Sequence, residues 1–132
     1  VVNTASMAGL SAWPGIGPYN ASKYAVVGIS ETLAIELQDT RVGVSVLCPG
    51  VVNTNIFQSQ RNRPEALRNE RRNPGARAAN AQVTTMQGID PSVVADQVHD
   101  AIVGDRFWIL THPELVEHVE RRTQSIVDTT RR

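Results

Sequence analysis

Two short apolar runs near the start of the chain enclose a long stretch with the composition of a helix. Residues 1–5 form a β-branched run that ends at Ser6, which predicts a buried strand followed by a turn. Glycine and proline recur in residues 9–18 and predict a loop. Residues 19–38 contain no proline and are rich in Ala, Leu, Ile and Glu, so they predict a long helix. Its apolar residues occupy more than one face, which favours packing against a sheet on one side and against another helix on the other.

The second apolar run completes a strand–helix–strand unit. Residues 42–48 are almost unbroken in their apolar character and are halted by Pro49 and Gly50. Such a run is typical of a parallel strand that is covered on both faces. Strand, helix and strand in this order predict a right-handed βαβ unit.

The rest of the chain begins with a polar excursion and then returns to regular elements. Residues 51–88 lack a sustained hydrophobic period, and residues 64–72 are their best helix candidate. Asp90 and the proline after it predict the start of another helix. Residues 107–110 predict a third strand, and residues 111–114 (THPE) match a capping box that would open a last helix, running to about residue 127. The whole pattern predicts an α/β fold, half of a doubly wound parallel sheet.

Composition and charge narrow the classes of partner. The 132 residues suit one domain, with 41% hydrophobic and 20% charged residues and a formal net charge of zero. We therefore expect no nucleic-acid partner and no membrane partner. Residues 61–77 hold six arginines against two glutamates but no aromatic residue, which argues against stacking on single-stranded nucleic acid. We interpret this arginine-rich stretch as part of a solvated segment that covers a substrate.

The cysteine and the histidines suggest little chemistry of their own. Cys48 is the only cysteine, so no disulfide forms within the chain, and we expect a cytoplasmic protein with a buried, inert thiol. His99, His112 and His118 lack the spacing of metal ligands, and we expect no metal site.

Tyr19 and Lys23 are the strongest candidates for catalysis. They are four residues apart at the start of a helix, so their side chains share one face. A free tyrosine loses its proton only near about pH 10, and a neighbouring ammonium favours the phenolate, which suits the pair to proton exchange with a carbonyl or an alcohol. Ser6 ends the preceding strand, where ligands of parallel sheets collect. The pair alone is a common match, and it gains weight from its place between the Ser6 strand and the Pro49 turn.

Four segments in this order resemble the classical short-chain dehydrogenase/reductase family. Residues 1–9 (VVNTASMAG) are similar to its strand and serine motif, and residues 19–25 (YNASKYA) to its central active-site motif. Residues 48–54 (CPGVVNT) are similar to its Pro-Gly motif, and residues 107–114 (FWILTHPE) to the last strand of some members. The resemblance is expected to extend over essentially the whole chain.

The resemblance implies an enzyme that interconverts a carbonyl and a secondary alcohol with NAD or NADP. Tyr19 would be the proton donor or acceptor, Lys23 would assist it and bind the nicotinamide ribose, and Ser6 would polarise the substrate oxygen. The residues that would line the cofactor are Pro49, Gly50, Val52 and Thr54. Met7 and Trp13 would either wall the substrate pocket or pack in the core. The helix at residues 19–38 resembles the family's dimerisation helix, which implies a homodimer or homotetramer at full length.

The same resemblance implies that part of the family's pattern is missing. The Gly-rich phosphate-binding turn and the catalytic Asn precede the strand at Val1 in the family, and neither occurs in this sequence. Residues 1–132 are therefore expected to be the C-terminal half of one Rossmann-like dehydrogenase domain, with only its last three strands and a variable substrate lid at residues 51–90. On its own such a half would be inactive. The alternative is a dinucleotide-binding regulatory or scaffold protein of the same fold without turnover.

Overall fold

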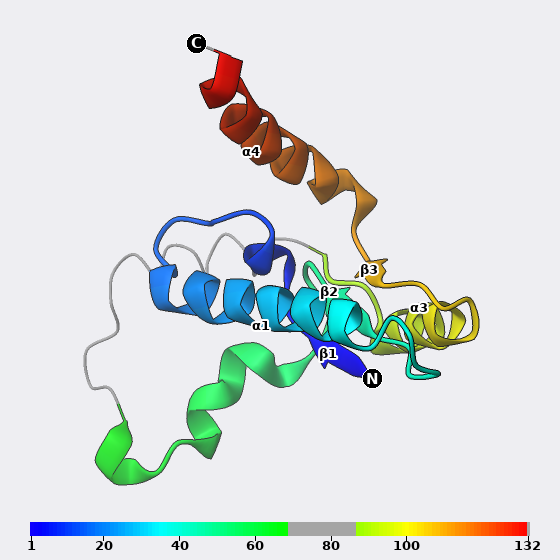
Figure 1. Ribbon diagram of the computed structural model, residues 1–132. Coiled ribbons are helices and arrows are strands. Elements are labelled where there is room, and N and C mark those ends of the chain that lie inside the picture. The colour runs from blue at the N-terminus through cyan, green and yellow to red at the C-terminus, as the bar shows by residue number, and fades with distance from the viewer. Residues whose placement is uncertain (69–86, 132) are drawn as a thin grey trace.

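The computed structural model describes residues 1–68 and 87–131. Three parallel strands form one sheet in the order β1-β2-β3 (Figure 1), with bounds Val2–Thr4, Ser45–Cys48 and Trp108–Leu110. The helices are α1 (Gly17–Glu36), α3 (Pro91–Val103) and α4 (Val116–Asp128). Short 3-10 helices lie at Met7–Gly9, Asn55–Asn62, Glu65–Leu67, Pro113–Leu115 and Thr129–Arg131. The three predicted strands and the α/β class are confirmed.

The sheet is covered on both faces, as a doubly wound fold requires. Successive residues of a strand point to opposite faces, and β2 supplies both cores. Val46 and Cys48 belong to one buried cluster with Val27 of α1. Leu47 belongs to a second cluster with Ala101 of α3 and Ile109 of β3. β2 is apolar along nearly its whole length because helices pack against both of its faces, as the sequence indicated.

The second strand is shorter than predicted. The apolar run begins at residue 42, but Val42 is 47% exposed and lies outside β2. Pairing with β1 is described from Val2, which faces Ser45. A run of apolar residues extends as a strand only as far as a neighbouring strand can pair with it.

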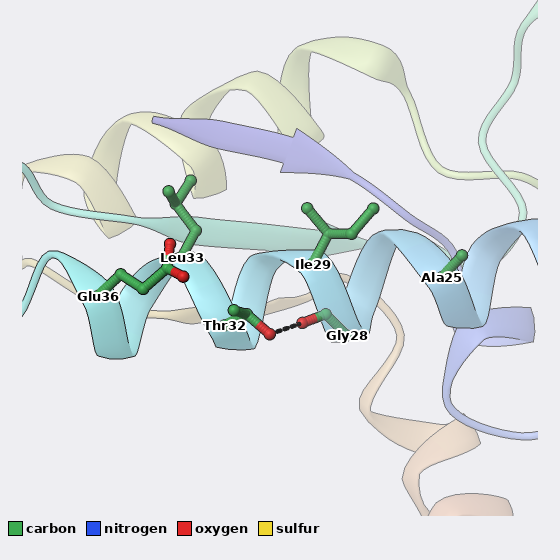
Figure 2. A pocket seen from close by; sticks show the side chains of 6 residues that line it. All are labelled: Ala25, Gly28, Ile29, Thr32, Leu33 and Glu36. Atoms are coloured by element: carbon green, nitrogen blue, oxygen red, sulfur yellow. Dashed lines mark hydrogen bonds between the residues drawn. The ribbon is translucent and has the colours of Figure 1, made fainter.

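The helix predicted at residues 19–38 is displaced by two residues. It begins at Gly17, because Pro18 fits the first helical turn, where its missing N–H costs nothing. Ser30, which is fully buried, connects it to the sheet, since its hydroxyl accepts a hydrogen bond from Asn3 Nδ2 at 3.0 Å. Other residues of α1 are exposed, among them Ile29 (64%, Figure 2) and Ile35 (67%).

The start of α3 follows the prediction, and the start of α4 does not. The side chain of Asp90 accepts a hydrogen bond from the backbone N–H of Ser92, and Pro91 is in the first turn. At the other helix the expected capping box is absent: neither the 3-10 turn at Pro113–Leu115 nor α4 has a side-chain cap. The Thr111 hydroxyl instead contacts Nδ1 of His112 at 2.6 Å. The same hydroxyl accepts from the N–H of Gly50 at 3.4 Å, so a tertiary contact has replaced the helix cap.

The polar excursion leaves the sheet and returns to it at one place. Val52 forms a parallel bridge with Ile89, in which the N–H of Asn53 donates to Ile89 and the N–H of Ile89 donates to Val51. Gly88 fits there because a Cβ would lie 2.8 Å from the backbone nitrogen of Asn53. The helix candidate at residues 64–72 is described only to residue 68, and the central part of the predicted lid lies outside the described residues.

In Figure 1 the last helix, α4, leads away from the sheet to the C-terminus. Within residues 1–68 and 87–131, none of the helices combines the length and the apolar character that a membrane crossing demands.

Candidate active site

The carboxyl ends of the three strands meet at one edge of the sheet, because the strands are parallel. Ser6 follows β1, Pro49 and Gly50 follow β2, and Thr111 and His112 follow β3. Backbone hydrogen bonds fasten the first two segments together, since the N–H of Met7 donates to Pro49 at 2.9 Å. Ligands of open α/β sheets bind at this edge.

Ser6 caps the 3-10 turn at Met7–Gly9 and leaves its hydroxyl weakly engaged. Its Oγ accepts from the N–H of Ala8 at 3.2 Å and donates to the carbonyl of Pro49 at 3.4 Å. The second contact is at the long end for an O–H donor. The hydroxyl can therefore turn toward a better acceptor at small cost.

Tyr19 and Lys23 lie together at the start of α1. The ammonium of Lys23 is 5.7 Å from the centroid of the Tyr19 ring, within the range of a cation–π contact. The ammonium also donates a hydrogen bond, 3.1 Å long, to the carbonyl of Thr4, the last residue of β1. This bond uses one of the three N–H groups of Lys23. Tyr19 is 38% exposed, so its phenol is open to a ligand.

Gly9 lets the turn after β1 approach α1 closely at Lys23. A Cβ at position 9 would lie 2.6 Å from the Lys23 carbonyl oxygen and 3.1 Å from a methyl group of Val27. Only a residue without a side chain fits there. The contact joins the Ser6 turn to the helix that carries Tyr19 and Lys23.

The four residues predicted to line a cofactor lie in one continuous segment after β2. Pro49 and Gly50 form the turn at the sheet edge, and Val52 forms the bridge to Ile89. Thr54 is exposed, and its hydroxyl accepts from the N–H of Ile56 at 3.4 Å. The structure places Pro49 beside the Ser6 turn, and the role of all four with a cofactor stays a prediction.

The two residues with alternative predictions, substrate wall or core, differ in burial. Met7 is 3% exposed and belongs to the buried cluster with Val46 and Cys48. Trp13 is half-buried, and its ring centroid is 5.3 Å from that of His118 in α4. Asn20, beside Tyr19, holds the loop through a 2.7 Å hydrogen bond to the Trp13 carbonyl. The position of Met7 favours core packing, and Trp13 is the better candidate to meet a substrate.

Cys48 lies under this site and is chemically quiet. It is fully buried at the end of β2. Burial raises the pKa of its thiol to about 11, against smaller opposing effects of a hydrogen bond to the Ser6 backbone and of the Lys23 charge. The thiol is therefore protonated at neutral pH, as expected for an inert cysteine.

The sequence analysis missed Thr111 and His112 as members of the sheet edge. Both are 5% exposed, and both contact the backbone N–H of Gly50. Residues 111–114 were interpreted as a helix start, and a tertiary role was not considered. Both residues directly follow a predicted parallel strand, and this position could have identified them as members of the site. Among the described residues, no three His, Cys, Asp or Glu side chains gather into a group.

Known proteins resemble this chain in sequence. Residues 1–65 match the family of short chain dehydrogenases. The chain is also similar to the CLA biosynthesis dehydrogenase/reductase of Lactiplantibacillus plantarum, with 36% identity over 96% of this chain and 47% of that protein. A C alpha-dehydrogenase of Sphingobium is 26% identical over 98% of this chain and 43% of its own length. The chain is thus similar in sequence to members of the short-chain dehydrogenase/reductase family.

A solved structure shows the same fold. It is a short chain dehydrogenase/reductase from Burkholderia phymatum in complex with NAD, with a TM-score of 0.88 and 42% identity over 97% of this chain and 48% of that one. The chain thus spans about half the length of the relatives it matches.

The comparisons correct one expectation. We expected the family resemblance to run through essentially the whole chain, as the family's C-terminal half. That expectation is wrong, because the family match lies in the N-terminal portion of this chain, residues 1–65. The motifs that the sequence assigned to catalysis and to cofactor binding all end by Thr54, within the matched residues.

Proposed function

We propose that this chain supplies the acid–base groups of an NAD- or NADP-dependent oxidoreductase that interconverts a carbonyl and a secondary alcohol in the natural full-length protein. The observation that carries the proposal is the Tyr19–Lys23 pair. The ammonium of Lys23 is fixed between the Thr4 carbonyl and the Tyr19 ring, and the Tyr19 phenol stays open to a ligand. The NAD in the Burkholderia relative supports the choice of cofactor.

The residues act on the substrate oxygen. Tyr19 gives a proton to that oxygen in reduction and takes it back in oxidation. The positive charge of Lys23 stabilises the phenolate that forms after the proton leaves. Ser6 turns its weakly held hydroxyl from Pro49 to the same oxygen and polarises the carbonyl.

The residues present fit the nicotinamide-ribose end of such a cofactor. Lys23 has unused N–H donors for ribose hydroxyls, and the Pro49–Gly50 turn lies beside it at the sheet edge. A bound nicotinamide would supply or accept the hydride. The Gly-rich turn that holds a pyrophosphate in dinucleotide-binding folds does not occur in this sequence.

The proposal includes the protein's surroundings. Its partner is a small carbonyl or alcohol, with Trp13 beside the site. The single, buried Cys48 suits a reducing cytoplasm. We propose residues 51–90 as the segment that decides which substrate is accepted.

Tyr19→Phe tests the proposal in the full-length protein. Removing the phenol oxygen should lower carbonyl turnover at least about 100-fold, because the general acid is lost, while cofactor affinity stays near its normal value. Steady-state rates on a panel of carbonyl substrates and calorimetric cofactor titration measure the two effects. Tyr24→Phe, in the same helix as Tyr19, is the matched control: its ring packs against Arg122 of α4, and loss of its hydroxyl should leave turnover unchanged.

Two results would count against the proposal. Turnover by Tyr19→Phe at the normal rate would show that another group transfers the proton. Cofactor binding by the unmodified protein without turnover of any carbonyl or alcohol would favour the regulatory or scaffold alternative.

A further inference from the structure

The residues that follow β3 reach across the sheet edge to the turn that follows β2. The N–H of Gly50 donates to Nδ1 of His112 at 3.2 Å and lies 3.4 Å from Oγ1 of Thr111. Thr111 Oγ1 is itself 2.6 Å from the same Nδ1. Nδ1 therefore accepts a hydrogen bond, so the ring carries its proton on Nε2.

The ring of His112 also fills the space beside Gly50. A Cβ at position 50 would lie 2.6–2.9 Å from three atoms of the imidazole, closer than any real Cβ contact. The ring and the glycine are thus mutually dependent. Residue 50 has no room for a side chain while the ring is in place.

The polarity of the His112 ring indicates that it does more than fill space beside Gly50. The ring is 5% exposed, and its Nε2 has no hydrogen-bond partner among the described residues. A buried N–H without a partner is costly, and an apolar side chain of similar size would avoid that cost. The contact that an apolar residue cannot make is the one from Nδ1 to the Gly50 N–H.

We propose that His112 is a positioning residue, which fixes the Pro49–Gly50 turn against the sheet edge and so sets the surface offered to the nicotinamide cofactor. The effect on cofactor binding rests on the proposed function, whereas the contact between His112 and Gly50 does not. His112 does not touch the reacting atoms; it acts through the backbone of Gly50. Thr111 supports it, since its Oγ1 lies 2.6 Å from Nδ1 and also accepts from the Gly50 N–H.

A double-mutant cycle on the full-length protein tests the inference. Gly50→Ala alone should raise the KM for the cofactor about tenfold with kcat within about threefold, because the added Cβ displaces the turn. His112→Ala alone should raise KM about fivefold, since the turn loses its acceptor. In the combined variant the space for the Cβ is free, so Gly50→Ala should add no more than about twofold.

His112→Asn provides the rescue. Its amide oxygen can take the place of Nδ1 as acceptor, so KM should return to within about twofold of normal. Hydrogen exchange at the Gly50 amide should be fast in His112→Ala and slow in His112→Asn. If His112→Ala fails to fold, His112→Asn and His112→Leu carry the comparison: both keep branched atoms beside Gly50, but only Asn offers an acceptor, so exchange of the Gly50 amide should be slow in the first and fast in the second.

The outcomes separate the inference from the proposed function. The inference is overturned if Gly50→Ala has the same effect in every background, or if the variants lower the melting temperature while KM and Gly50 exchange stay unchanged. If the unmodified protein binds no cofactor, the proposed function fails. Gly50 exchange and the coupling in melting temperature then still decide whether His112 holds the turn.

Discussion

Buried Cys48 shows how one residue at this site is set by its surroundings rather than by its own chemistry. It follows Leu47 at the end of β2, where both faces of the sheet are covered. Burial raises the pKa of its thiol from 9.0 to about 11. Although Lys23 and the Ser6 backbone favour the thiolate, loss of water at the sulfur dominates.

The raised pKa predicts a loss of stability at alkaline pH. The folded protein holds the thiol proton more tightly than the unfolded chain, so the free energy of unfolding should fall as pH rises from about 9 to about 11. The total decrease in the free energy of unfolding should be on the order of 2–3 kcal/mol. Below pH ~9 this group should cause no change in stability. Urea unfolding at a series of pH values measures it.

Cys48→Ala is the control for other groups that titrate in that range. It removes the thiol, so its stability should fall less steeply with pH than that of the unmodified protein. Equal slopes for the two proteins would show that the thiol ionises freely in the folded state.

At the scale of elements, close backbone contact determines where the catalytic groups lie. The turn at Met7–Gly9 packs on α1 at the Lys23 carbonyl, and Gly9 has no room for a Cβ. Lys23 in turn reaches the end of β1 through Thr4. The strand, the turn and the helix therefore position one another.

Gly9→Ala should separate these elements. The new Cβ would meet backbone atoms of Lys23 at 2.6–2.8 Å, which cannot move aside as a side chain can. We expect the free energy of unfolding to fall by about 1–3 kcal/mol. Turnover should fall as well, because Lys23 shifts relative to Tyr19. Chemical denaturation and steady-state kinetics measure the two effects.

Gly28→Ala is the matched control in the same helix. No heavy atom lies within 4 Å of a Cβ there, and alanine favours a helix interior over glycine by about 0.5–1 kcal/mol. This variant should be as stable as the unmodified protein or more so. Equal effects of the two substitutions would refute the close-contact argument.

At the scale of the whole molecule, α1 has one apolar side that the described residues leave open. A shallow hollow on it is lined by Ala25, Gly28, Ile29, Thr32, Leu33 and Glu36 (Figure 2). Exposed apolar patches of this kind mark interfaces. We propose this side of α1 as the self-association surface of a homodimer or homotetramer.

Ile29→Glu tests the association. A charge in the patch should reduce the mass of the full-length protein in solution to that of a smaller species, as measured by size exclusion with light scattering. Val103→Glu, 74% exposed at the end of α3, should leave the mass unchanged. An unchanged mass with Ile29→Glu, accompanied by lower stability, would show that another part of the same chain covers this side.

The fold was predictable as far as local patterns determine it. Apolar runs gave all three strands, and Asp90 with Pro91 gave the start of α3, because capping and strand burial depend on neighbouring residues. The exact length of β2 was not predictable, since it depends on where β1 pairs with it. The capping box at Thr111 failed for a similar reason: its hydroxyl found His112 and Gly50 instead of the helix start.

For this protein the sequence alone determined the three strands, the presence of the helices α1, α3 and α4, and the pairing of Tyr19 with Lys23, because residues four apart on a helix share a face. Only the tertiary structure decided that Lys23 binds the Thr4 carbonyl and that position 9 has no room for a side chain. It also decided that His112 accepts a hydrogen bond from Gly50, 62 positions away in the sequence. These contacts join residues that the chain separates and the sheet brings to one edge. No periodic pattern in the sequence records such contacts.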